Sequence, residues 1–198
     1  MFIVFEGIDG AGKSTQISLL EAYLRAKTTK DIILTREPGG TKVAEQIRTL
    51  LFTQDIDDRL TELFLYIAAR RENFLKTIKS PIEEQSIVIC DRFIYSTIAY
   101  QGYGFGIDIK TIEQLNSLII PQKYCPTVTF ILDVEVESAI SRSIGQKKYE
   151  STLDIHFYEK VRSGFVELSK REHSYLIDAN KDPEDVHNEI LDIVVTYL

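Results

Sequence analysis

The sequence has little of what marks disulfide-bonded, membrane-spanning or fibrous proteins. Its 198 residues include only two cysteines, Cys90 and Cys125, which are too few and too unpatterned for a disulfide framework or a metal site. No apolar run approaches the about 18 residues that a membrane-spanning helix needs, and there is no internal repeat, low-complexity tract or inter-domain linker. We therefore expect one globular domain in a reducing compartment, and we expect it to be cytoplasmic.

Positive charge is also scarce. The 23 Lys and Arg residues are outnumbered by 30 Asp and Glu residues, which gives a formal net charge of −7 at pH 7. A chain with this balance has no general attraction for nucleic-acid polymers or anionic membranes, so we expect neither among its partners. Any anionic ligand must instead bind at a local cluster of positive charge.

Glycine is average in number but uneven in distribution. Eight of the ten glycines lie in three short stretches, at residues 7–12, 39–40 and 102–106. This clustering predicts three loops with special backbone geometry.

Apolar runs of strand length alternate with longer segments of helical periodicity. The runs are rich in β-branched residues and do not alternate with polar ones, as in strands covered on both faces: Phe2–Phe5, Asp31–Thr35, Ser86–Cys90, Val128–Leu132 and Tyr175–Ile177. The first run has no basic residues before it, so we expect a strand rather than a signal peptide. The helical segments are Lys13–Ala26, Thr41–Leu51, Asp58–Ile78, Leu153–Ser169 and a last helix from Pro183. The alternation predicts an α/β fold with a doubly wound parallel sheet of five strands.

Two segments differ from this pattern. Asp58–Ile78 is apolar almost all round between Leu60 and Leu75, so it needs cover on more than one face, and part of it is expected to form a subunit interface. Ser141–Glu150 has few apolar residues and is expected to be an exposed, mobile segment between helices.

Residues 7–14, Gly-Ile-Asp-Gly-Ala-Gly-Lys-Ser, match the phosphate-binding pattern G-x-x-x-x-G-K-[ST]. They follow a predicted strand and open a predicted helix, which is the context in which backbone N–H groups surround a phosphate. In such a loop Lys13 bridges the β- and γ-phosphates and Ser14 holds Mg²⁺. The pattern predicts ATP or GTP binding by Gly7, Asp9, Gly10, Ala11, Gly12, Lys13, Ser14 and Thr15.

Asp91 ends the third predicted strand, and Arg92 follows it. A carboxylate at this point of a P-loop protein lies beside the phosphates and holds Mg²⁺ directly or through water, and Arg92 would face the position where charge develops. Arg70 stands late in a predicted helix, where periodicity alone fits a surface arginine as well as a site residue. A guanine-specific GTPase is disfavoured, because the Asn-Lys pair at residues 180–181 lacks the spacing of N-K-x-D.

Two further motifs indicate which class of nucleotide-binding protein this is. The first is Thr-Arg-Glu-Pro-Gly-Gly-Thr at residues 35–41, and the second has the form D-R-F-x-x-S-T-x-A-Y-Q-G at residues 91–102. Together with the phosphate-binding loop (P-loop) at residues 7–14, they resemble the motifs of the thymidylate kinase family, in its bacterial branch. The resemblance covers essentially the whole chain. It implies a single P-loop kinase domain, residues 1–198, with a short lid at about residues 141–153. It also implies transfer of the ATP γ-phosphoryl group to dTMP, giving dTDP and ADP, with Mg²⁺ and in a homodimer.

The resemblance assigns roles around the sugar and phosphate of the acceptor. Asp9 would meet the deoxyribose 3′-hydroxyl, and Tyr100 would close against the 2′ position and disfavour ribose. Arg70 and Arg92 would grip the 5′-phosphate. Glu37 is placed near the acceptor and the metal.

The resemblance also assigns the contacts of the base. Tyr66 would stack on thymine, while Thr97 and Gln101 would hydrogen-bond its edge. Because the acceptor phosphate is already an anionic nucleophile at neutral pH, the reaction needs no general base. The three histidines, at positions 156, 173 and 187, are accordingly expected in exposed or helix-terminal roles.

On the donor side, the resemblance places Arg142 against adenine, with Ala179 and Asn180 on the other side of the ring. The lid of the bacterial branch usually carries arginines, but here Lys147 and Lys148 stand at the corresponding positions. A lysine cannot form a planar two-pronged contact with phosphate, so we expect these two catalytic cations to act as point charges.

Two other interpretations stay open. Another nucleoside monophosphate kinase or a deoxynucleoside kinase would use the same scaffold, although a deoxynucleoside kinase needs a base near the 5′-hydroxyl. The second is a nucleotide-binding regulator that has lost catalysis, which the intact Lys13, Ser14 and Asp91 disfavour.

Overall fold

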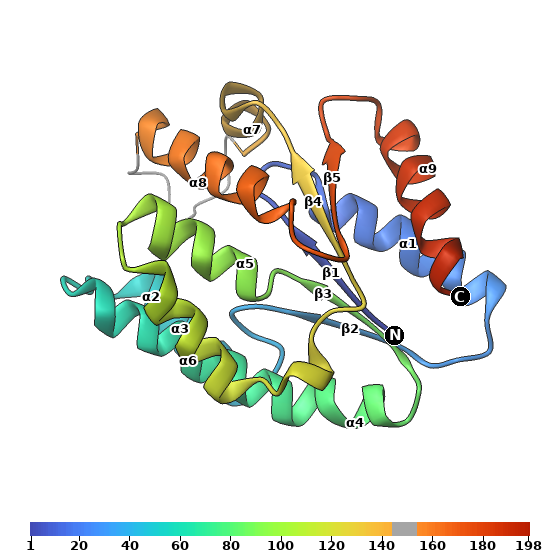
Figure 1. Cartoon of the computed structure of the whole chain (residues 1–198), viewed down its shortest axis with the longest axis horizontal. Coiled ribbons are helices and arrows are strands. Elements are labelled where there is room, and N and C mark those ends of the chain that lie inside the picture. Colours follow the sequence, from blue (N-terminus) through green and yellow to red (C-terminus); the bar gives the residue numbers. More distant parts are fainter. Residues whose placement is uncertain (144–153) are drawn as a thin grey trace.

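The computed structural model describes residues 1–143 and 154–198. At its centre is a parallel sheet of five strands: β1 (Phe2–Glu6), β2 (Ile32–Arg36), β3 (Ile87–Asp91), β4 (Val128–Asp133) and β5 (Ser174–Asp178). Their order is β2-β3-β1-β4-β5 (Figure 1). The predicted α/β fold with a five-stranded parallel sheet is thereby confirmed, and each strand lies within one residue of its predicted bounds.

The middle of the sheet explains the non-alternating apolar runs. β1 pairs with β3 on one side and β4 on the other, and Ile3, Phe5 and Phe130 are completely buried. Phe5 lies opposite Asp91, so β1 and β3 end at the same edge of the sheet. β2 ends there too, since Arg36 lies opposite Asp91. The three motifs follow these three strands and therefore meet at one edge, where open α/β sheets bind their ligands.

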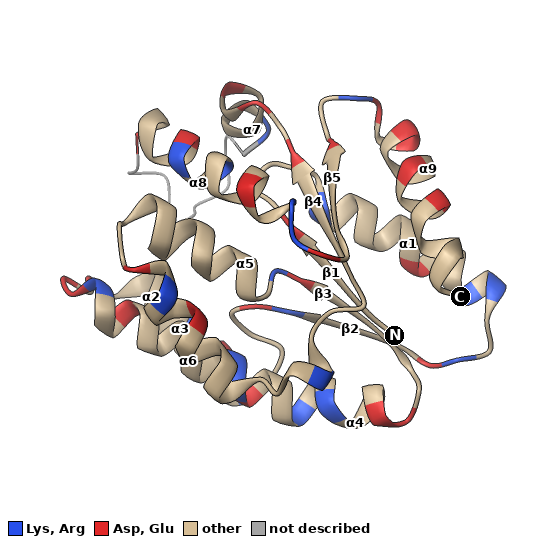
Figure 2. Ribbon diagram, in the orientation of Figure 1, with Lys and Arg blue, Asp and Glu red and all other residues tan. Residues whose placement is uncertain are grey.

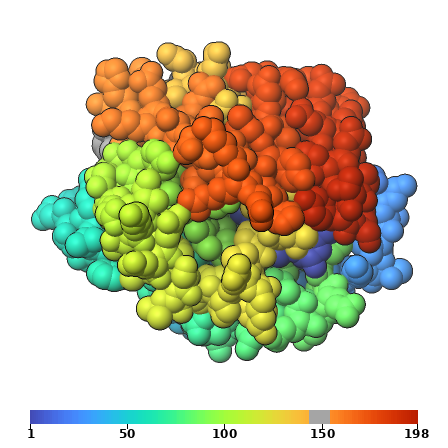
Figure 3. Space-filling model, viewed as in Figure 1, coloured from blue at the N-terminus to red at the C-terminus, as the bar shows by residue number. Residues whose placement is uncertain are grey.

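Helices cover both faces of the sheet (Figure 1). α1 (Lys13–Lys27) and α9 (Pro183–Val194) pack together on one face, while α3 (Arg59–Asn73), α5 (Ile94–Thr97) and α8 (Ile155–Leu168) lie on the other. The remaining helices are α2 (Lys42–Thr53), α4 (Lys79–Glu83), α6 (Ile109–Ile119) and α7 (Val136–Ser143). Figure 3 shows the C-terminal third of the chain, in orange and red, covering the upper part of the molecule in this view. Within the described ranges, no helix is long and apolar enough to cross a membrane.

The predicted helix Asp58–Ile78 is not one regular α-helix. Asp58 is its N-cap and accepts a hydrogen bond from the Thr61 N–H at 2.7 Å, but α3 ends at Asn73 and continues as a π-helical turn, η1 (Phe74–Ile78). Phe74 and Ile78 are both buried, so the wider turn keeps both side chains in the core. A second π-helical segment, η2 (Ile98–Gly104), extends α5.

The sequence analysis did not predict α6 and α7. A signal for α6 exists at Asp108, whose carboxylate accepts a hydrogen bond from the Thr111 N–H at 2.9 Å as an N-cap. The expectation of a mobile segment from Ser141 was wrong at its start, because residues 141–143 form the last turn of α7. Lys147, Lys148 and the rest of the predicted lid, at residues 144–153, lie outside the described residues.

Candidate active site

The loop between β1 and α1 brings the predicted phosphate-binding residues to the start of a helix. Gly12 caps α1 with a φ of 88° and has no side chain to occupy the first N–H groups of the helix, which are thereby left for an anion. Gly7 has a φ of 134°, and a Cβ there would lie 2.5 Å from the Leu132 carbonyl oxygen. Lys13 is buried, and its Nζ donates to the carbonyls of Gly7 at 3.1 Å and Ile8 at 2.9 Å. The ammonium group is therefore held against the loop.

The end of β3 fits a metal ion that binds nucleotide phosphates. The Oδ1 atom of Asp91 is buried and has no hydrogen-bond partner in the part of the chain that is described. A buried carboxylate oxygen of this kind is satisfied by a cation. The described residues contain no cluster of three or more His, Cys, Asp or Glu side chains that could hold a metal. The arrangement suits Mg²⁺, which is usually held by few protein ligands together with phosphates and water.

Arg142 and Ala179 border the same loop. Arg142 Nη1 donates to the Ala179 carbonyl at 3.2 Å, and both residues line a cavity of about 260 Å³ together with Gly12 and Thr15. Asn180 is not among the residues that line this cavity, and its side chain accepts a hydrogen bond from the Glu135 N–H at 3.2 Å. The structure thus places Arg142 and Ala179, two of the three residues predicted for adenine, next to residues predicted for the phosphates.

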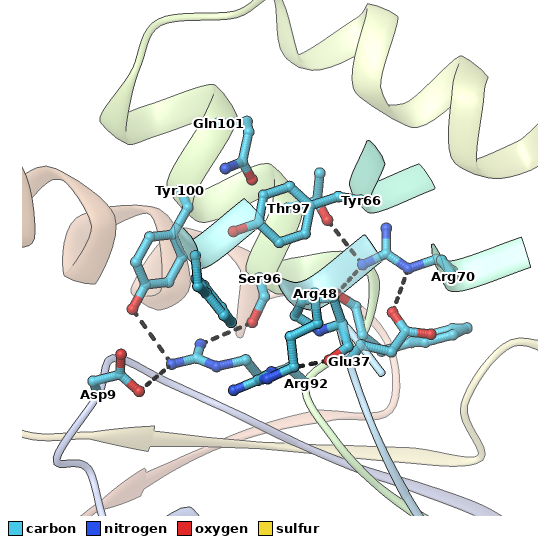
Figure 4. A pocket seen from close by; sticks show the side chains of 13 residues that line it. Asp9, Glu37, Arg48, Tyr66, Arg70, Arg92, Ser96, Thr97, Tyr100 and Gln101 are labelled. Atoms are coloured by element: carbon cyan, nitrogen blue, oxygen red, sulfur yellow. Dashed lines mark hydrogen bonds and ion pairs between the residues drawn. The ribbon is translucent and has the colours of Figure 1, made fainter. Parts of the chain in front are cut away.

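A second cavity, of about 330 Å³, lies beside the P-loop (Figure 4). It contains every residue predicted for the acceptor: Asp9, Glu37, Tyr66, Arg70, Arg92, Thr97, Tyr100 and Gln101. Further residues of its wall are Pro38, Arg48, Phe52, Phe93 and Ser96. Side chains from five separated parts of the chain therefore form one pocket.

Arg92 connects this pocket to the P-loop. Its guanidinium donates to the Gly7 carbonyl at 2.9 Å. It also donates to Ser96 Oγ at 3.0 Å and to the Asp9 carboxylate at 2.9 Å (Figure 4). Its backbone has a φ of 71°, which is uncommon outside glycine. Glu6 supports the turn, because its buried carboxylate accepts from the Phe93 N–H at 2.9 Å and from Ser96 Oγ at 2.5 Å. Burial raises the pKa of Glu6, although the hydrogen bond from Ser96 opposes this.

Arg70 lies in the wall of the pocket and is only 2% exposed. Its Nε donates to Glu37 Oε2 at 2.6 Å and its Nη1 to Asn116 Oδ1 at 2.7 Å. Its Nη2 donates to the Phe93 carbonyl and to Thr97 Oγ1, both at 2.8 Å. Four of its five N–H groups are thus used within the described protein, which leaves one for a ligand. Burial raises the pKa of Glu37, and the charge of Arg70 opposes this.

The sequence analysis missed Arg48, which comes from α2 and lines the same pocket. Its Nη1 donates to the Pro38 carbonyl at 2.9 Å. Burial, together with the charges of Arg36 and Arg92, lowers the pKa of Arg48. A signal was present, because Arg48 stands four residues after Ala44 and three before Leu51, the two buried residues of α2.

We expect Glu37→Ala to destabilise the fold strongly, because Arg70 would stay buried without its charge partner. The free energy of unfolding, measured by urea denaturation, is expected to fall by about 3–5 kcal/mol. Glu21→Ala is the control, because Glu21 pairs with Arg25 on the exposed side of α1 and should cost about 0.3–0.5 kcal/mol. A loss from Glu37→Ala as small as that of the control would contradict the role given to this ion pair.

Comparisons with known proteins show the family of the chain. The family model described as thymidylate kinase matches residues 5–190. The chain is 51% identical over 193 residues to thymidylate kinase of Ehrlichia ruminantium (strain Gardel), covering 96% of this chain and 93% of that one. It is 48% identical over 197 residues to thymidylate kinase of Wolbachia pipientis wMel, covering 97% of this chain and 98% of that one. The crystal structure of thymidylate kinase from Ehrlichia chaffeensis, 45% identical, superimposes with a TM-score of 0.81 over 98% of each chain. The chain belongs to the thymidylate kinase family.

Proposed function

We propose that the chain transfers the γ-phosphoryl group of ATP to dTMP, giving ADP and dTDP. The observation that carries the proposal is the acceptor pocket beside the P-loop, in which Arg92 contacts both Gly7 of the loop and Asp9 of the pocket. A nucleotide monophosphate in this pocket has its phosphate next to the donor loop. Relatives about half identical to the chain carry the name thymidylate kinase, which fits this acceptor.

The donor half of the site would bind ATP through the P-loop. Lys13 would turn from the loop carbonyls toward the β- and γ-phosphates, and Arg142, Ala179 and Asn180 would border adenine. Mg²⁺, held by the Ser14 hydroxyl and by Asp91, would supply positive charge to the donor phosphates. The catalytic roles of the lid lysines 147 and 148 stay a prediction.

In the acceptor half, we assign the 5′-phosphate to Arg92 and Arg48. Both arginines line the pocket. Burial lowers the pKa of Arg48, and the charges of Arg36 and Arg92 add to this effect, so a phosphate dianion bound between Arg48 and Arg92 would be stabilised by both guanidinium groups. The family resemblance had assigned the phosphate to Arg70 and Arg92, and Arg48 had no assigned role. Arg70 has only one N–H group left, and we propose that it holds the wall of the pocket and offers this group to the nucleotide.

The remaining pocket residues would select the nucleoside. Tyr66 would stack on thymine, and Asp9 would accept a hydrogen bond from the 3′-hydroxyl. The Tyr100 hydroxyl accepts a hydrogen bond from Arg92 Nη2 at 3.4 Å, and this side chain would occupy the space of a ribose 2′-hydroxyl. Thr97 and Gln101 would contact the edge of the base, and Glu37 would act by holding Arg70.

The chemistry needs charge compensation and alignment rather than proton transfer. An oxygen of the dTMP phosphate attacks the γ-phosphorus in line, and its lone pair forms the new P–O bond. The bond from the γ-phosphorus to the β,γ-bridging oxygen breaks, and its electrons leave with ADP. Arg48 and Arg92 would fix the attacking group, and Lys13 would offset the charge on the donor phosphates.

We further propose that two copies of the chain associate through α2 and α3, which pack against each other. Their outer surface exposes Leu50 (47%), Leu60 (47%) and Phe64 (54%), an apolar face typical of an interface. Sedimentation is expected to give twice the mass of one chain, and Phe64→Glu is expected to give a monomer. Leu118→Glu, on the exposed side of α6, is the control and should stay dimeric. A wild-type chain that sediments as a monomer would refute the dimer.

We expect Arg48→Ala to raise the KM for dTMP about 10- to 100-fold, because a charge-assisted contact to the phosphate is lost. The KM for ATP should change little. Arg36→Ala is the matched control, since Arg36 carries the same charge but pairs with Glu45 on the surface. Equal increases in both KM values for Arg48→Ala would show a structural role instead.

Release of ADP from ATP and Mg²⁺ tests the proposed function directly. We expect dTMP to give the highest kcat/KM among dTMP, dUMP, dCMP, AMP and thymidine. The proposed phosphate contacts disfavour thymidine, the deoxyribose contacts disfavour AMP, and the base contacts of Tyr66, Thr97 and Gln101 disfavour dUMP and dCMP. Turnover of thymidine as fast as that of dTMP would indicate a deoxynucleoside kinase. Nucleotide binding with no ADP release from any acceptor would indicate a regulator.

A further inference from the structure

A buried carboxylate adjoins the acceptor pocket and has no part in the mechanism above. Glu62 lies in the first turn of α3 and is 2% exposed. Its Oε2 forms an ion pair with Arg59 Nη1 at 2.7 Å. Its Oε1 accepts a hydrogen bond from Gln101 Nε2 at 3.2 Å, and Gln101 is 3% exposed. Glu62 therefore touches a residue of the pocket without itself lining the pocket.

This contact fixes which end of the Gln101 amide faces the nucleotide. An ionised carboxylate has only acceptors, so the NH₂ group of the amide must lie toward Glu62. The carbonyl oxygen then lies on the other side. Figure 4 shows the Gln101 side chain pointing down toward Tyr66 and Thr97, which are the residues proposed to contact the base. The pocket is thus given a hydrogen-bond acceptor at this position.

Further contacts hold Gln101 and Glu62 in place. Gln101 belongs to the π-helical segment η2, and its backbone carbonyl accepts from the Ile107 N–H at 3.0 Å. On the other side, the guanidinium of Arg59 lies 3.9 Å from the centre of the Phe105 ring, which keeps it beside Glu62. The carboxylate and the amide are held by separate elements, so their mutual orientation is set by packing.

We propose that Glu62 is a positioning residue that determines base specificity. By holding the Gln101 amide, it presents a carbonyl oxygen to the N3–H group of thymine. Cytosine has a lone pair at N3, so two acceptors would face each other and a buried group would be left without a partner. The inference rests on the proposed function, since it concerns the base that enters the same pocket.

Glu62→Gln tests the inference, because a glutamine both donates and accepts and lets the Gln101 amide take either orientation. The two acceptors compared are dTMP and 5-methyl-dCMP, which share the 5-methyl group and differ at N3 and at the 4 position. We expect the ratio of kcat/KM for dTMP over 5-methyl-dCMP to fall about tenfold. The KM for ATP should be unchanged. In Glu62→Asp, which keeps an acceptor-only side chain, the ratio should stay high.

A double-mutant cycle separates positioning from a general structural role. In a Gln101→Leu background there is no amide to orient, so Glu62→Gln should leave the ratio unchanged. Glu21→Gln, which removes a surface carboxylate, is the matched control for charge. An unchanged ratio in Glu62→Gln overturns the inference, and so does an equal fall in both backgrounds. If Glu62→Gln does not fold, retention of the ratio in Glu62→Asp supports the inference, and its loss there overturns it.

The outcome for the wild type keeps the two proposals apart. A wild-type chain that prefers dTMP, combined with an unaffected ratio in Glu62→Gln, would refute the role of Glu62 and leave the proposed function intact. A wild-type chain that does not phosphorylate dTMP would refute the proposed function as well.

Discussion

The acceptor pocket depends on a buried ion pair, Arg70 with Glu37, at 2.6 Å. Both side chains are almost fully shielded from water, so neither charge is tolerable without the other. The pair joins the segment after β2 to α3, and Arg70 adds bonds to Asn116 of α6 and Thr97 of α5. One charged group thereby fixes four elements around the pocket. The shape available to a ligand follows from that network.

Arg92 joins neighbouring parts of the site in the same way, at the boundary between the acceptor pocket and the P-loop. Its bonds to Gly7 and Asp9 tie the donor loop to the acceptor pocket, and Arg48 adds a second cation nearby. The chain as a whole carries a net charge of −7, and Figure 2 shows acidic residues along α9, on the other face of the sheet from α3 and α5. The positive charge that an anionic nucleotide requires is therefore local, and it is bound in place by carbonyls and carboxylates of the protein.

Sequence reasoning predicted the strands well, because buried strands leave continuous apolar runs that need no knowledge of distant contacts. Motifs that follow β1, β2 and β3 contain most of the pocket residues, and the parallel sheet brings these motifs to one edge. Tyr66 and Arg70 of α3 were assigned from the resemblance to the thymidylate kinase family. Arg48 was missed because it lies in none of the motifs and the resemblance had assigned it no role. One of the four occupied N–H groups of Arg70 bonds to Asn116 of α6, an element that was not predicted. The π-helical segments η1 and η2 were also missed, since their wider turns serve core packing that local periodicity does not encode.

A crystal structure of the chain with dTMP alone tests the central claim, that one pocket built on these arginines receives the acceptor. The account predicts the phosphate between Arg48 and Arg92, the thymine ring against Tyr66, and N3 within hydrogen-bond distance of the Gln101 carbonyl oxygen. A phosphate bound instead at the P-loop, with the pocket of Tyr66 and Arg70 empty, would contradict it.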